Sequence, residues 1–176
     1  MSTNKEVKSI DDFKGQKIRT MENSYHMDFW KALKANPTPM TFSEVYIGLQ
    51  QKTIDAQENP YEVIVSSKLY EQQDYVVETN HLPHYISLIV SDEFYKDLPK
   101  DQQKIISEAA ETAKEYARKA SDERIEDRMK VIKDSGTKIV RLDKKTQEDV
   151  RKASSDIYKS IEENVSKDVF DAYLNQ

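Results

Sequence analysis

The stretch KIRTMENSYHMDFW, residues 17–30, joins a strand pattern directly to a helix pattern. Residues 16–20 predict a short strand, with an arginine at position 19 near its end. From about Ser24 to Lys34 the apolar side chains recur at helical spacing; they are Tyr25, Phe29, Trp30 and Leu33. Pro37 and Pro39 then end the helix and favour an extended segment. This succession predicts a mixed α/β fold.

The same patterns continue along the chain. Residues 1–14 have the composition of a polar approach to the first strand, and further strands are expected at 53–56, 75–78, 84–91 and 138–142. Thr41 and Glu44 match a capping box that opens a helix. Asn59-Pro60 has the form of an N-cap followed by proline, which predicts a helix to about Leu69. Later helices are expected around 93–96 and 169–174, and one with Val150, Ala153, Ile157 and Ile161 on one face.

Composition excludes several classes of protein. The chain has 176 residues, a net charge of -5 and no basic stripe, so nucleic acid is not an expected partner. It has no cysteine, and therefore neither disulfides nor a thiolate metal site. No apolar run reaches about 18 residues, so no membrane span is predicted. The first 16 residues lack an apolar core, and we expect no secretory signal in the chain as given.

The segment from Pro99 to about Ser135 reads as one uninterrupted helix that Gly136 ends. At 1.5 Å per residue it is roughly 55 Å long, more than the diameter of a small domain. A narrow apolar seam follows it; its members are Ile105, Ala109, Ala113, Tyr116, Ala120, Ile125, Met129 and Ile132. The far half of that seam needs a partner subunit or a further domain to cover it.

Several collinear motifs resemble one known family. They are residues 17–40 ending in ANPTPM, FSEVY at 42–46, QENP at 57–60, KLYE at 68–71 and TNH at 79–81. The chain is similar to the C-terminal part of the DctP-like substrate-binding proteins of tripartite ATP-independent periplasmic (TRAP) transporters. That resemblance implies an α/β lobe of a two-lobed binding protein with one long helix along its back. It also implies a periplasmic or extracytoplasmic receptor that delivers small organic acids to membrane permease subunits.

The resemblance implies four residues that bind substrate. Arg19 corresponds to an arginine that forms a bidentate salt bridge with the substrate carboxylate, and a planar guanidinium suits that task. Phe42 corresponds to an aromatic ring on the ligand's apolar face, and Asn59 to an amide that contacts its carboxylate. Glu22 falls where some relatives have an asparagine, and there it would favour a hydroxylated monoacid over a C4-dicarboxylate. Met21, Glu58 and His81 are expected to support these groups from behind.

Each of these residues also has a purely structural interpretation. Arg19 could be a surface charge, Phe42 could pack under its helix, and Asn59 could only cap one. Glu22 could simply favour a helix N-terminus through its charge. His26 and His84 belong to no motif. We expect no metal site, no cofactor and no enzyme, because no metal-ligand cluster, phosphate loop or nucleophile motif is present.

Two positions depart from the family's pattern, which has glycine where this chain has Lys34 and Ala56. A residue forced to φ > 0 there would cost about 1 kcal/mol or more.

The expected organisation has three parts: a ligand-cleft lobe at 1–98, the long inter-lobe helix at 99–135, and a segment at 136–176 that packs with the other lobe. We expect a chain lacking its second lobe to form a homodimer or a domain-swapped pair and not to trap ligand as a monomer. The alternative is a truncated fragment that transports nothing and self-associates through the long helix.

Overall fold

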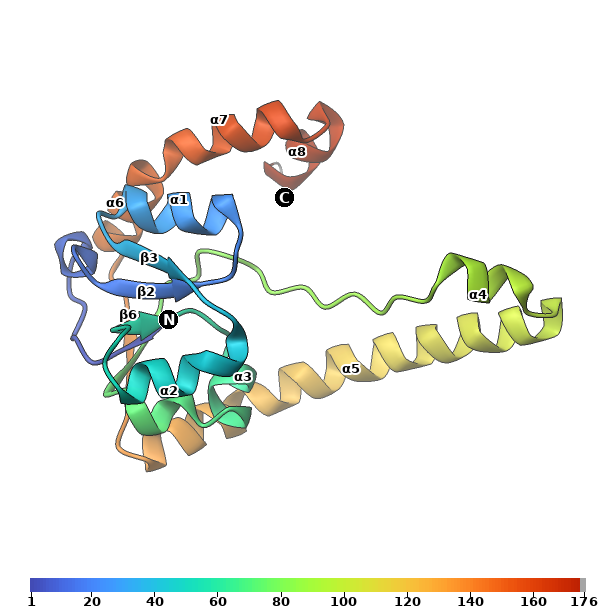
Figure 1. Cartoon of the computed structure of the whole chain (residues 1–176), viewed down its shortest axis with the longest axis horizontal. Helices are drawn as coiled ribbons and strands as arrows, with labels where there is room; N and C mark the ends of the chain where they lie inside the picture. The colour runs from blue at the N-terminus through green and yellow to red at the C-terminus, as the bar shows by residue number, and fades with distance from the viewer. Residues whose placement is uncertain (175–176) are drawn as a thin grey trace.

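Six strands form one sheet in the order β3-β2-β4-β1-β5-β6 in the computed structural model, which describes residues 1–174 (Figure 1). The strands are β1 (Ser2–Thr3), β2 (Lys17–Thr20), β3 (Asn36–Pro39), β4 (Ala56–Gln57), β5 (Tyr75–Glu78) and β6 (Lys138–Arg141). β2 runs parallel to β3 and β4, and β5 runs parallel to β6. The two-residue strand β1 lies between the two parallel sets and is antiparallel to both neighbours. The fold is therefore mixed α/β, as expected.

Helices cover both faces of this sheet. They are α1 (Ser24–Ala32), α2 (Val45–Gln50), α3 (Tyr61–Ser66), α4 (Asp92–Asp97), α5 (Lys100–Asp134), α6 (Lys144–Ala153), α7 (Ser155–Asn164) and α8 (Lys167–Leu174), with 3-10 turns at Ile10–Phe13, Phe42–Glu44 and Leu69–Gln72. Figure 1 shows α1 and α6 on one side of the sheet and α2 and α3 on the other.

Two hydrophobic cores match these two faces. One includes Phe13, Ile18, Trp30 and Val77, and the other includes Val45, Ile64, Val76 and Ile132. Adjacent strand residues point to opposite faces of a sheet, and neighbours Val76 and Val77 accordingly enter different cores.

α5 belongs to the body only at its C-terminal end. Ile132 is fully buried there, and Arg128 forms a two-bond ion pair with Glu62 of α3, at 2.7 and 3.2 Å. Towards its N-terminus the helix leaves the body, and Ile105 and Tyr116 remain 61% and 71% exposed. Figure 1 shows this part of α5 projecting with α4 folded back at its tip.

Several expected elements differ in the structure. Residues 84–91 form no strand: they run as extended chain without a sheet partner among residues 1–174. The helix after QENP is shorter than predicted, since α3 ends at Ser66 and a 3-10 turn follows. Its N-cap is Pro60, because the Asn59 amide bonds Gln57 instead of the helix.

The ends of three other elements also differ. The helix pattern around Val150 and Ile157 is divided into α6 and α7 at Ser154, whose hydroxyl donates to the carbonyl of Val150. The Thr41 hydroxyl donates to the Glu44 carboxylate and caps no backbone amide, so a 3-10 turn precedes α2. The polar start of the chain contains β1, and Ser2 and Thr3 are fully buried. Part of the segment 136–176, which we expected to pack on a second lobe, lies in this body as β6 and α6.

Lys34 occupies the left-handed region, with φ of 60°. It follows the C-cap of α1, where the amide of Ala35 bonds the Trp30 carbonyl and the amide of Lys34 bonds the Lys31 carbonyl. This is the Schellman arrangement that normally selects glycine. Ala56, the other departure from the family's pattern, lies in β4 and does not have a positive φ.

We therefore expect Lys34→Gly to raise the free energy of unfolding by about 0.5–1 kcal/mol, since glycine relieves the left-handed strain but adds disorder to the unfolded chain. Urea unfolding measures the change. Lys31→Gly, three residues earlier and inside α1, is the matched control and should lower stability by about 1 kcal/mol. Equal losses in both variants would contradict a strained Lys34.

Candidate functional site

A cavity of about 350 Å³ opens beside the ends of β2, β4 and β5. Arg19, Met21, Glu58, Asn59 and His81 line it, so five of the seven residues proposed from the sequence meet there. The other two do not line it: Glu22 is exposed just before α1, and Phe42 is 44% exposed in the turn before α2. Residues of α5, among them Arg124 and Ile125, form the opposite wall.

Arg19 lies buried on β2, with 4% of its surface exposed. Its Nε and Nη2 both donate to the carbonyl oxygen of Met40, at 2.9 and 2.7 Å. The Phe42 ring lies near the guanidinium, with 5.7 Å between Cζ and the ring centroid. Burial lowers the pKa of Arg19, which the nearby Glu58 charge partly opposes. Phe42 therefore touches the arginine, although it does not line the cavity.

No carboxylate among residues 1–174 forms a salt bridge with Arg19. Its partner is a neutral carbonyl, and that contact fixes the plane of the guanidinium without neutralising its charge. A buried cation normally needs a counter-charge. The arrangement therefore suits an anion that approaches from the cavity.

Asn59 is oriented by a chain of buried polar groups. Its Nδ2 donates to Gln57 Oε1 at 2.7 Å, and Gln57 Nε2 donates to the Ser2 hydroxyl at 2.8 Å. The Ser2 hydroxyl in turn donates to Gln73 Oε1 at 3.2 Å. Because Gln57 and Ser2 are fully buried, this order of donors fixes which end of the Asn59 amide is its nitrogen. Asn59 Oδ1 and one N–H remain for another partner.

Glu58 is the centre of a polar cluster behind Asn59. One oxygen accepts from Trp30 Nε1 at 2.8 Å and from His81 Nε2 at 2.6 Å, and the other from His26 Nδ1 at 2.6 Å. Thr79 Oγ1 lies 2.8 Å from His81 Nδ1. A neutral His81 with its proton on Nε2 satisfies both contacts, since Thr79 then donates to Nδ1. The cluster ties α1 and β4 to the segment after β5.

The charges in this cluster shift in opposite directions. Burial alone would raise the pKa of Glu58, but hydrogen bonds from His26, His81 and Trp30 hold it far below its usual range. The hydrogen bond to Glu58 raises the pKa of His26. Burial lowers the pKa of His81 despite the same carboxylate. His26 is thus the group of the pair that takes up a proton first.

A pH effect on stability follows from His26. A histidine whose pKa is raised on folding adds stability that is complete below its unfolded pKa near 6.5 and disappears as the pH rises through the folded value. We expect the stability difference between the wild type and His26→Gln to be larger at pH 5.5 than at pH 8.5, because glutamine keeps a donor but no charge. Urea unfolding at both pH values measures it.

His84→Gln is the control, because His84 is exposed and forms no salt bridge within residues 1–174. Its effect should be the same at both pH values. A His26→Gln difference that is constant from pH 5.5 to 8.5 would contradict the charge of His26.

His26 and Trp30 are the site residues that the sequence did not indicate as such. His26 belonged to no motif, and Trp30 was expected only as a core anchor. Their four-residue spacing places both on one face of α1, and this was the available signal. The partner carboxylate is 32 residues away from His26, beyond any local pattern.

No group of three or more histidine or acidic side chains within residues 1–174 could hold a metal ion. None of the helices in that part of the chain is both long enough and apolar enough to cross a membrane.

Comparison with known proteins assigns the family. The model of the bacterial extracellular solute-binding proteins, family 7 (DctP), matches residues 1–164. The chain therefore belongs to this family of solute-binding proteins. Its membership confirms the expected resemblance and agrees with a binding protein and not an enzyme.

Two curated relatives show the extent of the likeness. The 2,3-diketo-L-gulonate-binding periplasmic protein YiaO of Escherichia coli is 35% identical over 147 residues, which is 81% of this chain and 44% of that protein. The sialic acid-binding periplasmic protein SiaP of Vibrio cholerae is 29% identical over 168 residues, 96% of this chain and 51% of that protein. The chain thus spans about half the length of the relatives that it matches.

Solved structures give the same proportion. The sugar acid binding protein DctPAm of Advenella mimigardefordensis, in complex with galactonate, has a TM-score of 0.88 and 30% identity, and the match covers 99% of this chain and 56% of that one. A TRAP periplasmic solute binding protein of Shewanella oneidensis with bound succinate also has a TM-score of 0.88 and 30% identity, with 97% and 56% covered. The fold is that of part of a TRAP solute-binding protein.

Proposed function

We propose that this chain forms the arginine-bearing half of a two-lobed solute receptor of a TRAP transporter. The receptor binds a small organic acid in the periplasm or another extracytoplasmic space, and membrane permease subunits take the acid from it. One observation carries the proposal: the buried guanidinium of Arg19 is fixed by the Met40 carbonyl and has no acidic partner in residues 1–174.

The ligand in this proposal is an acid because of what the wall offers. Arg19 has donors left beyond those on Met40, and a carboxylate can accept them where no other negative group is bound. Asn59 has a free N–H and a free oxygen for the same ligand. Glu58 lies nearby, but three donors already occupy its oxygens and reduce its repulsion of an anion.

The proposed substrate class is a sugar acid or a C4-dicarboxylate. Similar proteins have been solved with galactonate, L-gulonate and succinate. Phe42 supports Arg19 by its contact with the guanidinium. The role of Glu22 as a hydroxyl acceptor stays a prediction, as it lies outside the cavity in this lobe and would need the second lobe to enclose it.

Binding calorimetry tests the proposal on a chimera in which the N-terminal half of YiaO precedes the full 176-residue chain. We expect micromolar binding of at least one of galactonate, gulonate and succinate, and no binding of the neutral polyol galactitol. The chain alone should bind none of them, because closure needs contacts from both lobes. Equal affinity for galactitol and galactonate would contradict an arginine–carboxylate site.

A second candidate function is a fragment that self-associates through α5 and transports nothing. The exposed Ile105 and Tyr116 on that helix favour it. Light scattering that shows a stable dimer of the chain at micromolar concentration would support this alternative, and a monomer would contradict it.

A further inference from the structure

Residues 84–90 have the composition of an inner strand, yet they contact no sheet. Ile86 and Leu88 point to one side of an extended chain and Tyr85 and Ile89 to the other, with exposures of 88%, 76%, 78% and 86%. A strand that is apolar on both sides is typical of a sheet with layers on both faces. The segment is therefore prepared for a position that residues 1–174 do not provide.

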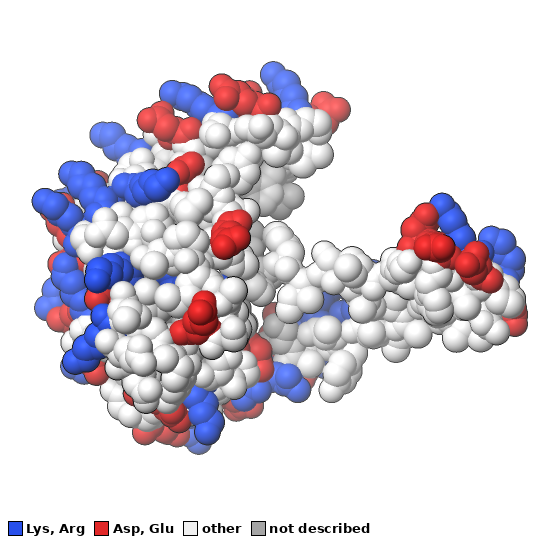
Figure 2. All heavy atoms as spheres, viewed as in Figure 1, with Lys and Arg blue, Asp and Glu red and all other residues white. Residues whose placement is uncertain are grey.

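The helices that follow form a preassembled support beside this segment. The Tyr95 hydroxyl of α4 lies 2.8 Å from Ser107 Oγ of α5, and Gln103 Nε2 donates to the Leu98 carbonyl at 2.8 Å. Figure 2 shows acidic and basic side chains at the tip of this projection, whereas the face between tip and body is almost free of them. Phe94, Ile105 and Tyr116 lie exposed along it. Monomeric proteins seldom expose so extended an apolar surface.

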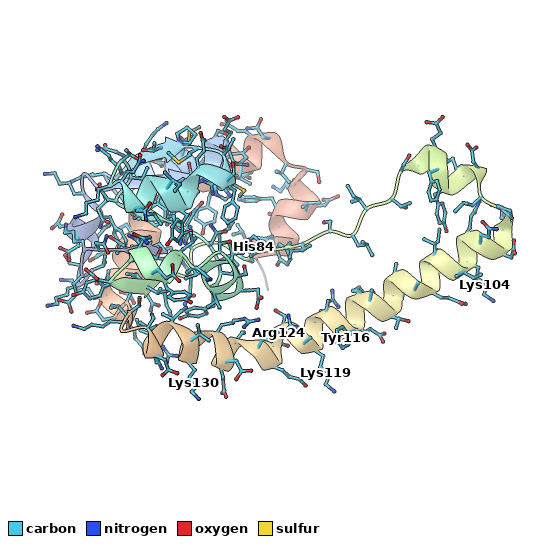
Figure 3. All side chains as sticks on the ribbon, turned by 60° about the horizontal axis from the view of Figure 1, so that its bottom comes forward. His84, Lys104, Tyr116, Lys119, Arg124 and Lys130 are labelled. Atoms are coloured by element: carbon cyan, nitrogen blue, oxygen red, sulfur yellow. The ribbon has the colours of Figure 1, made fainter. Side chains whose placement is uncertain are left out.

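The point where the segment leaves the body is fixed. His81 is held by Glu58, and the rings of His81 and Phe29 stack with 4.6 Å between centroids. Figure 3 shows His84 at the start of the extended segment and Arg124 on α5 across from it. Both residues line the same cavity. The projection thus begins at a defined place and is not a loose tail.

A second copy of this chain does not fit the segment. All inner strands of the body sheet already have two neighbours, so a copy offers only its edges. The β3 edge contains Pro37 and Pro39, which lack the amide that a ladder needs. The β6 edge begins and ends with exposed charges, Lys138 and Arg141. An edge also leaves one side of the added strand unpaired, whereas this segment is apolar on both faces.

The relatives indicate what does fit. This chain matches 56% of the DctPAm chain, so proteins of this family contain a further portion of nearly equal size. We propose that residues 84–118 are a donated arm: residues 84–90 enter the sheet of that portion as an inner strand, and α4 with the N-terminal half of α5 covers one face of it. The partner is the N-terminal half of a family 7 solute-binding protein. The assembly needs no ligand, so it can fail or succeed independently of the proposed function.

Hydrogen exchange of the chimera with the N-terminal half of YiaO tests the arm, with the 176-residue chain alone as reference. In the chain alone, the amides of 85–90 should exchange at nearly unprotected rates. In the chimera they should exchange at least about 100-fold more slowly, because the strand is paired on both sides. Unchanged exchange in a folded chimera would overturn the proposal, as would protection in the chain alone together with a dimeric mass.

Variants separate the arm from the body. Ile86→Asp should remove the protection of 85–90 in the chimera and leave the midpoint of unfolding of the chain alone unchanged. Ile47→Asp is the matched control, because Ile47 is 48% exposed on α2 of the body; it should leave the protection of the arm intact. Arg19→Ala should likewise leave arm protection intact while it removes acid binding. Loss of arm protection in the Ile47→Asp or Arg19→Ala variant, or its survival in Ile86→Asp, would overturn the proposal.

Discussion

Glu58→Ala is expected to lower the free energy of unfolding by about 3–5 kcal/mol, because it leaves several buried donors without their shared acceptor. The carboxylate side chain is 8% exposed and accepts from Trp30, His26 and His81. Water cannot easily replace it next to Trp30, which is fully buried. Urea unfolding with tryptophan fluorescence measures the loss and also reports on the chain's single Trp30.

Glu62→Ala provides the matched control for this result. Glu62 also binds a cation through two hydrogen bonds, from Arg128, but this pair lies on the surface between α3 and α5. Exposed ion pairs contribute little, so the control should lose only a small fraction of what Glu58→Ala loses. If Glu58→Ala does not fold, Glu58→Gln keeps the shape and one acceptor and should show an intermediate loss. Similar losses for Glu58→Gln and Glu62→Ala would contradict a central role of Glu58.

Arg19→Ala is expected to weaken acid binding by the two-lobed chimera at least about 100-fold, since charged hydrogen-bond pairs that are desolvated contribute several kcal/mol. Arg19→Lys should recover little of this loss. An ammonium is a point charge and cannot bond the Met40 carbonyl in a fixed plane while it presents two parallel donors to a carboxylate. Calorimetry with the acid that binds the unmodified chimera most tightly measures both changes.

Arg141→Ala is the control for the arginine series. Arg141 lies exposed on β6 and pairs with Glu78 at 2.7 Å, away from Met40 and Phe42. It should leave acid affinity nearly unchanged. Retention of affinity in Arg19→Ala, with a folded chimera, would remove the arginine from the proposed site.

Much of the site was predictable because its residues belong to continuous motifs. Arg19 stands in a strand pattern, and Asn59 and Glu58 stand in QENP, so the sequence indicated them before any contact was known. Their partners were not indicated in the same way. The Met40 carbonyl that fixes Arg19 is a backbone atom 21 residues away, and no residue type encodes it. His26 and Trp30 meet Glu58 only because α1 packs against the end of β4.

Two strands show the limit more clearly. β1 has two polar residues, Ser2 and Thr3, and no strand pattern, yet it lies inside the sheet because β4 and β5 bond it on both sides. Residues 84–90 have a strong strand pattern and lie in no strand of residues 1–174. Strand propensity states how well a side chain fits a pleated surface and not whether that surface is present.

The sequence by itself determined the α/β class, the strands at β2, β5 and β6, the long helix and its end at Gly136, because these depend on periodicity and local turn chemistry. Only the tertiary structure decided that Arg19 is buried without a counter-charge, that Glu58 joins three distant donors, and that the arm leaves the body uncovered. These properties arise from desolvation and from contacts across 20 to 40 residues of chain, which the order of residues does not express locally.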